Sequence, residues 1–293
     1  MVATEPTLDV SIVLPVHNEA GHLADEIDRI SSSMEASPYS WELVLVDDGS
    51  TDGSARIGVG KPHVRVLRSA RNRGAGTARR IGTEAAHGRI VVWSDADMSY
   101  PNDRIPELVD ELGNGDHIVG ARTSEQGTLK LLRVPAKWVI RRLASYLTKT
   151  KIPDLNSGFR AFRRDVALQY THQLPAGFSC VTTITMAFLM NGYSVEFTPI
   201  DYAERAGRSK FHWLADTRRY ALQVIRMILS YDPLRVVLPI ASLIGVVFVA
   251  KLGYDLVDKD FRPAANTLLL GFLLFQVLVI GLLADLVVRV TRP

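Results

Sequence analysis

Residues 8 to about 120 alternate short apolar segments with amphipathic ones, and this alternation restricts the possible folds more than any other feature of the sequence. The apolar runs predict strands, and the segments between them show the three- to four-residue periodicity of helices. Strands that alternate with helices indicate a mostly parallel sheet covered by helices. We expect strands at 10–16, 42–46, 64–67, 90–94 and 117–120, and helices at 21–34, 76–87 and 104–112.

The fourth expected strand ends in two carboxylates, Asp95 and Asp97, one residue apart. Side chains at i and i+2 of an extended segment point the same way. Two such oxygen ligands suit Mg²⁺ or Mn²⁺, which keeps waters and shares its other positions with substrate phosphates. The carboxyl end of a parallel strand is also where an open α/β sheet places its ligand. The other interpretation of this D-x-D pair is a solvated turn after a strand.

Polar motifs also follow the first and second expected strands, at residues 15–19 and 47–52. Because these strands end at the same sheet edge, we expect the two motifs to lie side by side. There Asp47 or Asp48 is a candidate acceptor of hydrogen bonds from a nucleobase or ribose, as carboxylates are in other nucleotide sites. The other interpretation is turn chemistry, which Asp, Gly and Ser favour.

The segment 71–79 partly matches a dinucleotide-binding fingerprint. Arg79 stands where that fingerprint has its third glycine, so a soluble dinucleotide enzyme is not favoured. We interpret the segment as a Gly-rich loop that opens a helix, and we expect the first amides of that helix to face an anion.

Two more segments carry charged side chains suited to sugar or phosphate binding. Asp154 either orients a sugar hydroxyl or serves as a base, or it forms an Asx turn with an ion pair to Arg160. The segment 205–210 contains Arg205, Arg208 and Lys210, and such side chains bind phosphate. Attraction to a membrane surface alone is the other interpretation of this basic loop.

Two long uncharged apolar stretches, 236–250 and 266–284, lie near the C-terminus. A membrane-spanning helix needs about 20 mostly apolar residues, so we expect spans at about 234–254 and 265–288 that form a transmembrane hairpin. The other interpretation is a buried helical pair in a soluble core. Basic residues cluster before the first span and after the second, which predicts a cytoplasmic location for both ends and for the large domain.

Between residue 129 and the hairpin, the sequence contains two basic amphipathic segments. The segments 131–147 and 211–229 mix Leu, Ile and Trp with arginines, as interfacial helices do, although surface helices packed on their own domain look similar. We therefore predict a catalytic domain at 1–210 with an interfacial helix at 129–150, a juxtamembrane helix at 211–232, and the hairpin at 233–293. The N-terminus has no signal-peptide pattern. The net charge of +3 gives no sign of a nucleic-acid partner.

As a set, the motifs resemble those of family 2 glycosyltransferases with the GT-A fold, and most of all the polyprenyl-phosphate sugar synthases. The resemblance covers almost the whole chain, and it rests on LPVHNEA, VDDGSTDGS, NRGAGTARRIGTEAAHG, SDADMSYP, DLNSGFRAF and RAGRSKF. It implies an inverting transfer of a hexose from a UDP- or GDP-sugar to undecaprenyl or dolichyl phosphate at the cytoplasmic face of the cell membrane. It further implies Mg²⁺ or Mn²⁺ as the cofactor, and it leaves a homo-oligomer open.

Carried over residue by residue, the resemblance gives roles to individual side chains. Nucleotide-sugar binding falls to Pro15, Glu19, Asp47, Asp48, Asp95 and Arg122, and the metal to Asp95 and Asp97. The lipid phosphate falls to Arg122, Arg205 and Lys210, together with Arg133 or Lys137, between which the register does not decide. The candidate catalytic residues are Asp97, Asp154, Arg205 and Lys210. Many relatives have a polar residue such as Gln at the position of Ser99, where it supports the metal.

Two other functions compete with this one. A processive polysaccharide synthase of the same superfamily needs a Q-x-x-R-W motif and more spans, and none of the four tryptophans has that context. A non-catalytic membrane scaffold that keeps the fold is favoured by loss of an acidic metal ligand, yet Asp95 and Asp97 are both present.

Overall fold

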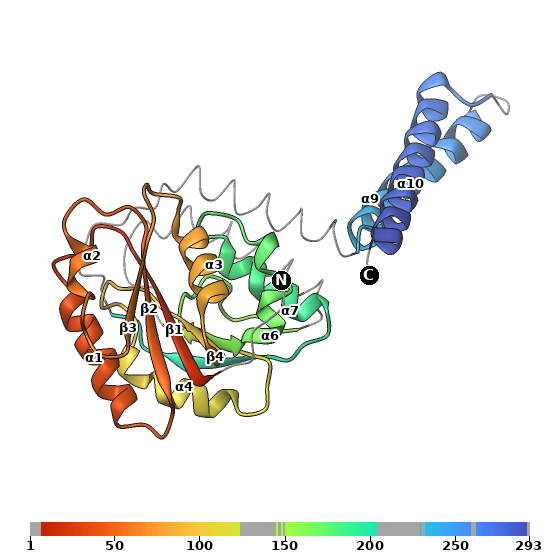
Figure 1. Cartoon of the computed structure of the whole chain (residues 1–293). Coiled ribbons are helices and arrows are strands. Elements are labelled where there is room, and N and C mark those ends of the chain that lie inside the picture. Colours follow the sequence, from red (N-terminus) through yellow and green to blue (C-terminus); the bar gives the residue numbers. More distant parts are fainter. Residues whose placement is uncertain are drawn as a thin grey trace. The chain divides into compact units, whose positions relative to one another are not determined.

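The computed structural model describes residues 7–123, 145, 148, 150–203, 229, 232–258 and 262–291. Two compact units divide the chain, Met1–Ala221 and Leu222–Pro293. The first unit contains a mixed sheet flanked by helices, and the second contains two long helices (Figure 1).

The described part of the first unit forms one seven-stranded sheet with the order β3-β2-β1-β4-β6-β5-β7. Only β6 runs antiparallel to its neighbours β4 and β5, so the predicted mostly parallel sheet is confirmed. The strands are β1 (Leu8–Val16), β2 (Trp41–Asp47), β3 (Val64–Arg68), β4 (Gly88–Trp93), β5 (His117–Arg122), β6 (Arg160–Arg163) and β7 (Val195–Ile200).

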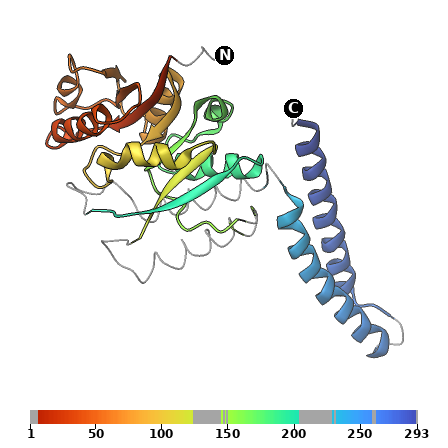
Figure 2. The ribbon, with the colours of Figure 1, turned by 90° about the horizontal axis from the view of Figure 1, so that it is seen from below.

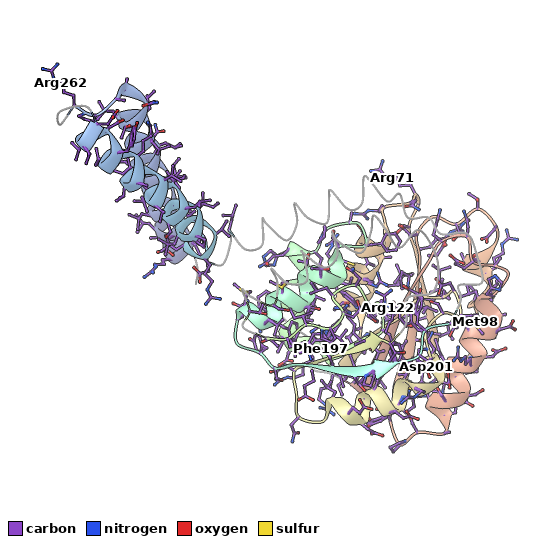
Figure 3. The ribbon with its side chains drawn as sticks, turned by 180° about the vertical axis from the view of Figure 1, so that it is seen from behind. Arg71, Met98, Arg122, Phe197, Asp201 and Arg262 are labelled. Carbon is purple, nitrogen blue, oxygen red and sulfur yellow. The ribbon has the colours of Figure 1, made fainter. Side chains whose placement is uncertain are left out.

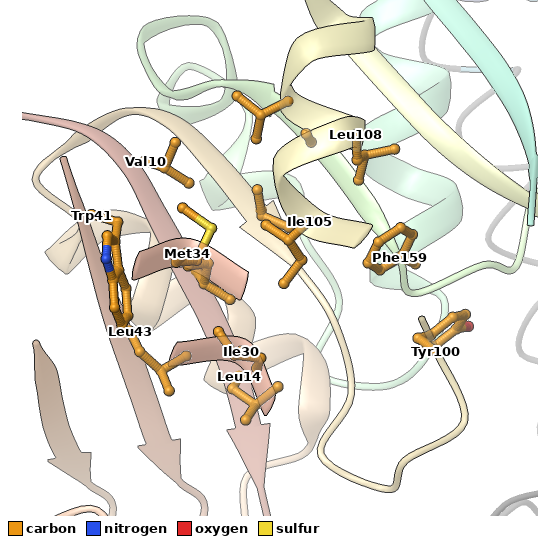
Figure 4. Packing of buried hydrophobic residues seen from close by; sticks show 14 of the residues in the cluster. Val10, Leu14, Ile30, Met34, Trp41, Leu43, Tyr100, Ile105, Leu108 and Phe159 are labelled. Carbon is orange, nitrogen blue, oxygen red and sulfur yellow. The ribbon is translucent and has the colours of Figure 1, made fainter. Parts of the chain in front are cut away.

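Helices cover both faces of this sheet. They are α1 (Leu23–Glu35), α2 (Ser54–Ile57), α3 (Ala75–Ala85), α4 (Ile105–Leu112), α6 (Arg164–Leu168) and α7 (Cys180–Met190), with 3-10 turns η1 (Asn102–Arg104) and η2 (Thr171–Gln173). On one face, α1 and α4 lie together (Figure 2), and Ile30 of α1, Ile105 of α4 and Leu14 of β1 belong to one buried cluster (Figure 4). On the other face, residues of α3, α6 and α7 pack on β1, β2 and β4 in a second cluster.

Two strands, β6 and β7, and three helices, α2, α6 and α7, have no counterpart among the elements expected from the sequence. The strand β6 contains two arginines in four residues, and β7 contains Pro199. A proline is tolerated in β7 because this strand is at the edge of the sheet. Three threonines, residues with low helix propensity, lie in α7, which is nevertheless a helix and is buried over most of its length.

A buried histidine packs against the second core cluster. His117 is 1% exposed, and its ring lies edge-on to Phe162 and Phe188, with centroid distances of 5.6 and 4.9 Å. Burial, and next the charge of Arg160, lower the pKa of His117 well below its ordinary value. The imidazole is therefore neutral in the folded protein at neutral pH.

We expect His117→Phe to make the protein less sensitive to acid. The folded-state pKa of His117 lies below the unfolded value of about 6.5, so the unfolded chain takes up the proton first and stability falls as the pH drops below that value. For one such group the slope approaches about 1.4 kcal/mol per pH unit. Denaturant midpoints between pH 7 and pH 5 measure it, with the exposed His172→Asn as control. Equal slopes in wild type and His117→Phe contradict the assignment.

The second unit contains α9 (Leu234–Asp258) and α10 (Ala265–Thr291), which are long and apolar enough to be candidate membrane spans. Small residues let the two helices approach each other closely. A Cβ on Gly281 lies 2.5 Å from a methyl carbon of Val237, and one on Gly271 lies 2.8 Å from the ring of Phe248. Asp255 of α9 accepts hydrogen bonds from the Ala264 amide, at 2.8 Å, and the Thr267 hydroxyl, so it closes the turn of the hairpin.

Candidate active site

The loops that follow β1 and β2 are joined to each other at the carboxyl edge of the sheet. Val16 and Asp47 are register partners at the ends of the two strands. Beyond them the Asn18 amide donates to Ser50 Oγ at 3.0 Å, and Asn18 Oδ1 accepts from the Thr51 amide at 2.9 Å. The expected side-by-side placement of these two motifs is confirmed. Pro15 and Glu19 lie in the same region, Pro15 opposite Val46 in the sheet and Glu19 with its amide on Ser54 Oγ.

The adjacent carboxylates of Asp47 and Asp48 hold the local backbone. Asp47 is 0% exposed and accepts from the Ser50 amide at 3.1 Å, which is the turn chemistry that the sequence leaves open. Asp48 accepts from the amides of Arg73, at 2.8 Å, and Gly74, at 2.7 Å. Asp48 therefore attaches the Gly-rich loop to the end of β2.

The first amides inside α3 do not face an anion, contrary to the expectation from the Gly-rich segment, although the amide of the N-cap residue Gly74 donates to the Asp48 carboxylate. The amides of Gly76 and Thr77 donate instead to the carbonyl of Ala176, at 2.7 and 3.4 Å. A Cβ on Gly76 lies only 2.0 Å from the Pro175 carbonyl oxygen. Gly74 has φ +93°, a conformation that glycine adopts without strain. The glycines thus permit a close contact between α3 and the loop 175–177.

We expect Gly76→Ala to destabilise the domain by about 1–3 kcal/mol, since backbone atoms must move to admit the methyl group. Gly21→Ala is the matched control, because a Cβ there meets no atom within 4 Å. Denaturant midpoints of the two variants provide the comparison. Equal midpoints show that the loop 175–177 yields without cost and that the close contact is not required.

The D-x-D pair lies in the loop after β4, and each of its carboxylates has a partner. Asp97 is 4% exposed, and its Oδ1 accepts from the Ser99 amide at 3.2 Å and from the Ser99 hydroxyl. Asp95 Oδ1 accepts from Arg79 Nη2 at 2.5 Å. Met98 has φ +61°, uncommon for a residue with a side chain, and such strained positions cluster at functional sites.

A buried polar network around Asn102 holds this loop against the core. Asn102 is 0% exposed; its Nδ2 donates to Glu26 Oε1 at 2.6 Å and to the Asp95 carbonyl at 3.3 Å, and its Oδ1 accepts from Ser94 Oγ at 2.5 Å. Burial raises the pKa of Glu26, and the Asn102 hydrogen bond only partly opposes this effect. The loop that carries Asp95 and Asp97 is therefore held from within the core.

The donor set at the end of β4 fits a metal that is shared with a ligand. Asp95 and Asp97 provide carboxylate oxygens, and the described residues contain no group of three or more His, Cys, Asp or Glu side chains suited to a metal ion. Mg²⁺ is commonly bound through one or two carboxylates plus substrate phosphates. The residues present fit such a shared site rather than a cage made by the protein alone.

Asp154 pairs with Arg122, not with Arg160. Arg122, at the end of β5, donates from Nε to Asp154 Oδ2 at 2.7 Å and from Nη2 to Oδ1 at 3.1 Å. The Asx turn is present, because Asp154 also accepts from the Asn156 amide at 2.8 Å. Burial raises the pKa of Asp154, but the hydrogen bonds and charge of Arg122 outweigh it and hold the pKa below its ordinary value.

Arg160, the alternative partner, is 0% exposed and donates to the Val181 carbonyl, at 2.6 Å, and to Thr185 Oγ1, at 2.7 Å. Its Nε donates to the Ser157 carbonyl at 3.2 Å. It therefore shapes the loop that carries Asp154 without pairing with the carboxylate.

The residues just after β7 contact both the D-x-D loop region and Arg122. The Tyr202 ring lies 5.0 Å from that of Tyr100 and 5.2 Å from the guanidinium carbon of Arg122. The Ala203 amide donates to the Ser99 carbonyl at 2.9 Å. Figure 3 labels Met98 in the D-x-D loop, Arg122 at the end of β5 and Asp201 just after β7. Ala203, the last described residue before the basic segment 205–210, thus lies beside the D-x-D loop.

Four predicted phosphate-contacting side chains, Arg133, Lys137, Arg205 and Lys210, lie outside the described residues. A basic cavity of about 500 Å³ opens at the end of β3, beside the loop that Asp48 holds. Its lining residues are Val46, Leu67, Arg68, Ser69, Ala70, Arg71, Arg73 and Ile81. Its arginines give this side of the domain a positive potential, which favours the approach of an anionic ligand.

One residue of the site, Arg79, is not among the site residues expected from the sequence. The sequence around Arg79 does contain a sign of this role. Arg79 shares one side of α3, which is buried, with the small residues Gly76, Ala78, Gly82 and Thr83. A long charged side chain among such small neighbours has room to lie inside the protein and needs a buried partner there. That partner is Asp95.

Comparisons with known proteins agree with this geometry. A family model described as glycosyl transferase family 2 matches residues 11–171. The chain belongs to glycosyl transferase family 2. Among curated members, a dodecaprenyl-phosphate galacturonate synthase from Rhizobium johnstonii is 32% identical over 56% of this chain and 50% of its own length. An undecaprenyl-phosphate 4-deoxy-4-formamido-L-arabinose transferase from Shewanella sediminis is 32% identical over 70% of this chain and 62% of its own length. The chain thus matches about half to three fifths of these relatives.

Solved structures show the same fold. A glucosyl-3-phosphoglycerate synthase from Mycobacterium tuberculosis, in complex with Mn²⁺, UDP-glucose and phosphoglyceric acid, has a TM-score of 0.59 at 20% identity. The match covers 75% of this family 2 chain and 80% of that one. The GT-A-like fold expected from the motifs is therefore confirmed.

Proposed function

We propose that this family 2 protein transfers a sugar from a nucleoside-diphosphate sugar to a polyprenyl phosphate. One observation carries the proposal: the D-x-D loop, the Arg122–Asp154 pair and the entry to the basic segment 205–210 are joined at one sheet edge. This arrangement supports a site for a diphosphate donor next to a site for a phosphate acceptor. The curated relatives are sugar transferases named for polyprenyl phosphates, which supports this choice of acceptor.

On the donor side, Pro15, Glu19 and Asp48 line the edge where a UDP- or GDP-sugar binds, with Asp47 beneath them. Asp95 and Asp97 hold Mg²⁺ or Mn²⁺, which when bound neutralises charge on the diphosphate leaving group. Mn²⁺ accompanies UDP-glucose in the solved relative, which supports this role. Both carboxylates sit on a loop held by Asn102, so their oxygens are oriented before the ligand arrives.

On the acceptor side, Arg122, Arg205 and Lys210, with Arg133 or Lys137, bind the lipid phosphate. One phosphate oxygen attacks the anomeric carbon opposite the diphosphate, the carbon–oxygen bond to the diphosphate breaks, and the configuration inverts. The phosphate is already ionised, so no strong base is required. Asp154 is paired with Arg122 and has a lowered pKa, which favours a role in orienting that arginine.

The lipid acceptor requires the protein to work at a membrane. The candidate spans α9 and α10 anchor the chain, and the segments 129–150 and 211–232 bring the catalytic domain to the headgroup layer. The arginines that flank the spans support a cytoplasmic location for this domain, where nucleotide sugars are dissolved.

Purified full-length protein with undecaprenyl phosphate and a panel of labelled UDP- and GDP-sugars tests the proposal. With Mg²⁺ or Mn²⁺, label from one donor is expected in the organic phase, and chelator is expected to prevent its appearance. Labelled polymer in the aqueous phase instead indicates a polysaccharide synthase. No transfer and no nucleotide binding by folded protein favours the scaffold.

A further inference from the structure

A buried arginine is paired with the first carboxylate of the D-x-D pair. Arg79 projects from α3, is 1% exposed, and donates from Nη2 to Asp95 Oδ1 at 2.5 Å. Its Nη1 lies 3.8 Å from Cys180 Sγ, and its guanidinium carbon lies 5.7 Å from the centroid of the Trp93 ring. These contacts hold the guanidinium in place, and its charge is shielded from solvent.

The charges buried in this region include more than one guanidinium. Arg160 is 0% exposed, and its hydrogen bonds go to neutral oxygens of Ser157, Val181 and Thr185. Burial, and next the charge of Arg79, lower the pKa of Arg160 to about 10, so it is still a cation at neutral pH. Charges interact more strongly where water is excluded. The two interacting cations therefore make the interior near Asp95 unfavourable for a further positive charge.

Both carboxylates of the pair already accept hydrogen bonds from other groups of the protein. Asp95 Oδ1 accepts from Arg79, and Asp97 Oδ1 accepts from the Ser99 amide and hydroxyl. The described residues offer no third acidic, His or Cys side chain in a group with them. A dication that approaches this pair in the absence of other ligands meets one neutralised carboxylate and one that is partly engaged.

We propose that Arg79 makes metal binding at Asp95 and Asp97 dependent on the nucleoside diphosphate. In the ligand-free protein, Arg79 neutralises Asp95 and keeps the pair a weak site for the bare cation. The diphosphate supplies the negative charge that the pair lacks, so cation and nucleotide bind together. By linkage, each raises the affinity of the other by the same factor. The inference rests on the proposed function, because it requires a nucleotide site beside the pair.

Titration of full-length protein with Mn²⁺, read as the loss of the free-ion electron paramagnetic resonance signal, tests this without turnover. For wild type, UDP or GDP is expected to tighten Mn²⁺ binding by about tenfold or more, within the usual range of coupling between sites. Arg79→Gln removes the competing charge and is expected to tighten binding of Mn²⁺ alone by about tenfold, by Coulomb's law at this short range. Arg79→Lys keeps the charge and is expected to retain the wild-type dependence on nucleotide.

Arg80→Gln is the matched control, because Arg80 is the next residue of α3, pairs with Glu84 at the surface, and loses the same charge. The proposal is overturned if folded Arg79→Gln binds Mn²⁺ alone no more tightly than Arg80→Gln. It is also overturned if wild type binds Mn²⁺ equally with and without nucleotide, or if Mn²⁺ binding by Arg79→Lys no longer depends on nucleotide. Neither of these two results requires Arg79→Gln to fold. Failure of the proposed function looks different, because neither UDP nor GDP then binds at any Mn²⁺ concentration.

Discussion

Asp97→Asn is expected to lower sugar transfer by about 10²–10³-fold, the usual loss when one preorganised charge-stabilising group is removed. The substitution keeps an oxygen that can accept from the Ser99 amide, so the loop is expected to hold its shape. It removes the negative charge that the metal requires. The measurement is the rate of transfer to undecaprenyl phosphate at saturating donor, together with the dependence of that rate on Mn²⁺.

Asp103→Asn provides the comparison for Asp97→Asn. Asp103 lies a few residues further on, in η1, and pairs with Arg29 at the surface. Its variant is expected to retain transfer close to wild type. If Asp97→Asn also retained full, chelator-sensitive transfer, the assignment of the D-x-D pair to the metal would be wrong.

Asp154→Asn is expected to raise the KM for the polyprenyl phosphate by about 10–100-fold, as loss of an orienting partner does. Arg122 then keeps a neutral hydrogen-bond acceptor but loses the charged fork that fixes its guanidinium. We expect kcat to fall much less than this, because the ionised acceptor phosphate needs no base. Initial rates over a range of acceptor concentrations separate the two effects.

The competing role for Asp154 predicts the reverse pattern. Loss of a general base lowers kcat by about 10²–10⁴-fold with KM unchanged, and it removes the acid limb of the pH–rate profile. Asp165→Asn is the control, since Asp165 also accepts from a neighbouring arginine, Arg163, but at an exposed position. A fall in kcat alone in Asp154→Asn would show that this residue acts on the reacting atoms.

Much of the fold follows from local pattern, because β1 to β5 are apolar runs between helical segments. The elements that escaped prediction depend on distant partners. In β6, Arg160 is stabilised by acceptors on α7, more than 20 residues away along the chain. In β7, a proline is permitted only because the strand is at the sheet edge. Neither circumstance can be read from the few residues of the strand itself.

The residues of the candidate site also divide into those that local sequence predicts and those that only tertiary structure brings together. Asp95 and Asp97 can be recognised in the sequence, because two carboxylates one residue apart directly follow an expected strand. The groups that hold them cannot be found in this way. Arg79, which pairs with Asp95, comes from α3, and Glu26, which accepts from the Asn102 side chain under the loop, comes from α1. The pairing of Asp154 with Arg122 rather than Arg160 is likewise a result of tertiary structure: in sequence Arg160 is much the nearer arginine, yet it turns toward α7.

The measurement that tests the central claim most directly is the ³¹P spectrum of undecaprenyl phosphate incubated with the full-length protein, Mg²⁺ and the preferred nucleotide sugar. If the sugar goes to the lipid phosphate, the phosphomonoester signal is replaced by a phosphodiester signal, and one nucleoside diphosphate appears for each diester formed. Release of nucleoside diphosphate with the monoester signal unchanged would contradict the account, because the sugar would then have gone to water or to another acceptor.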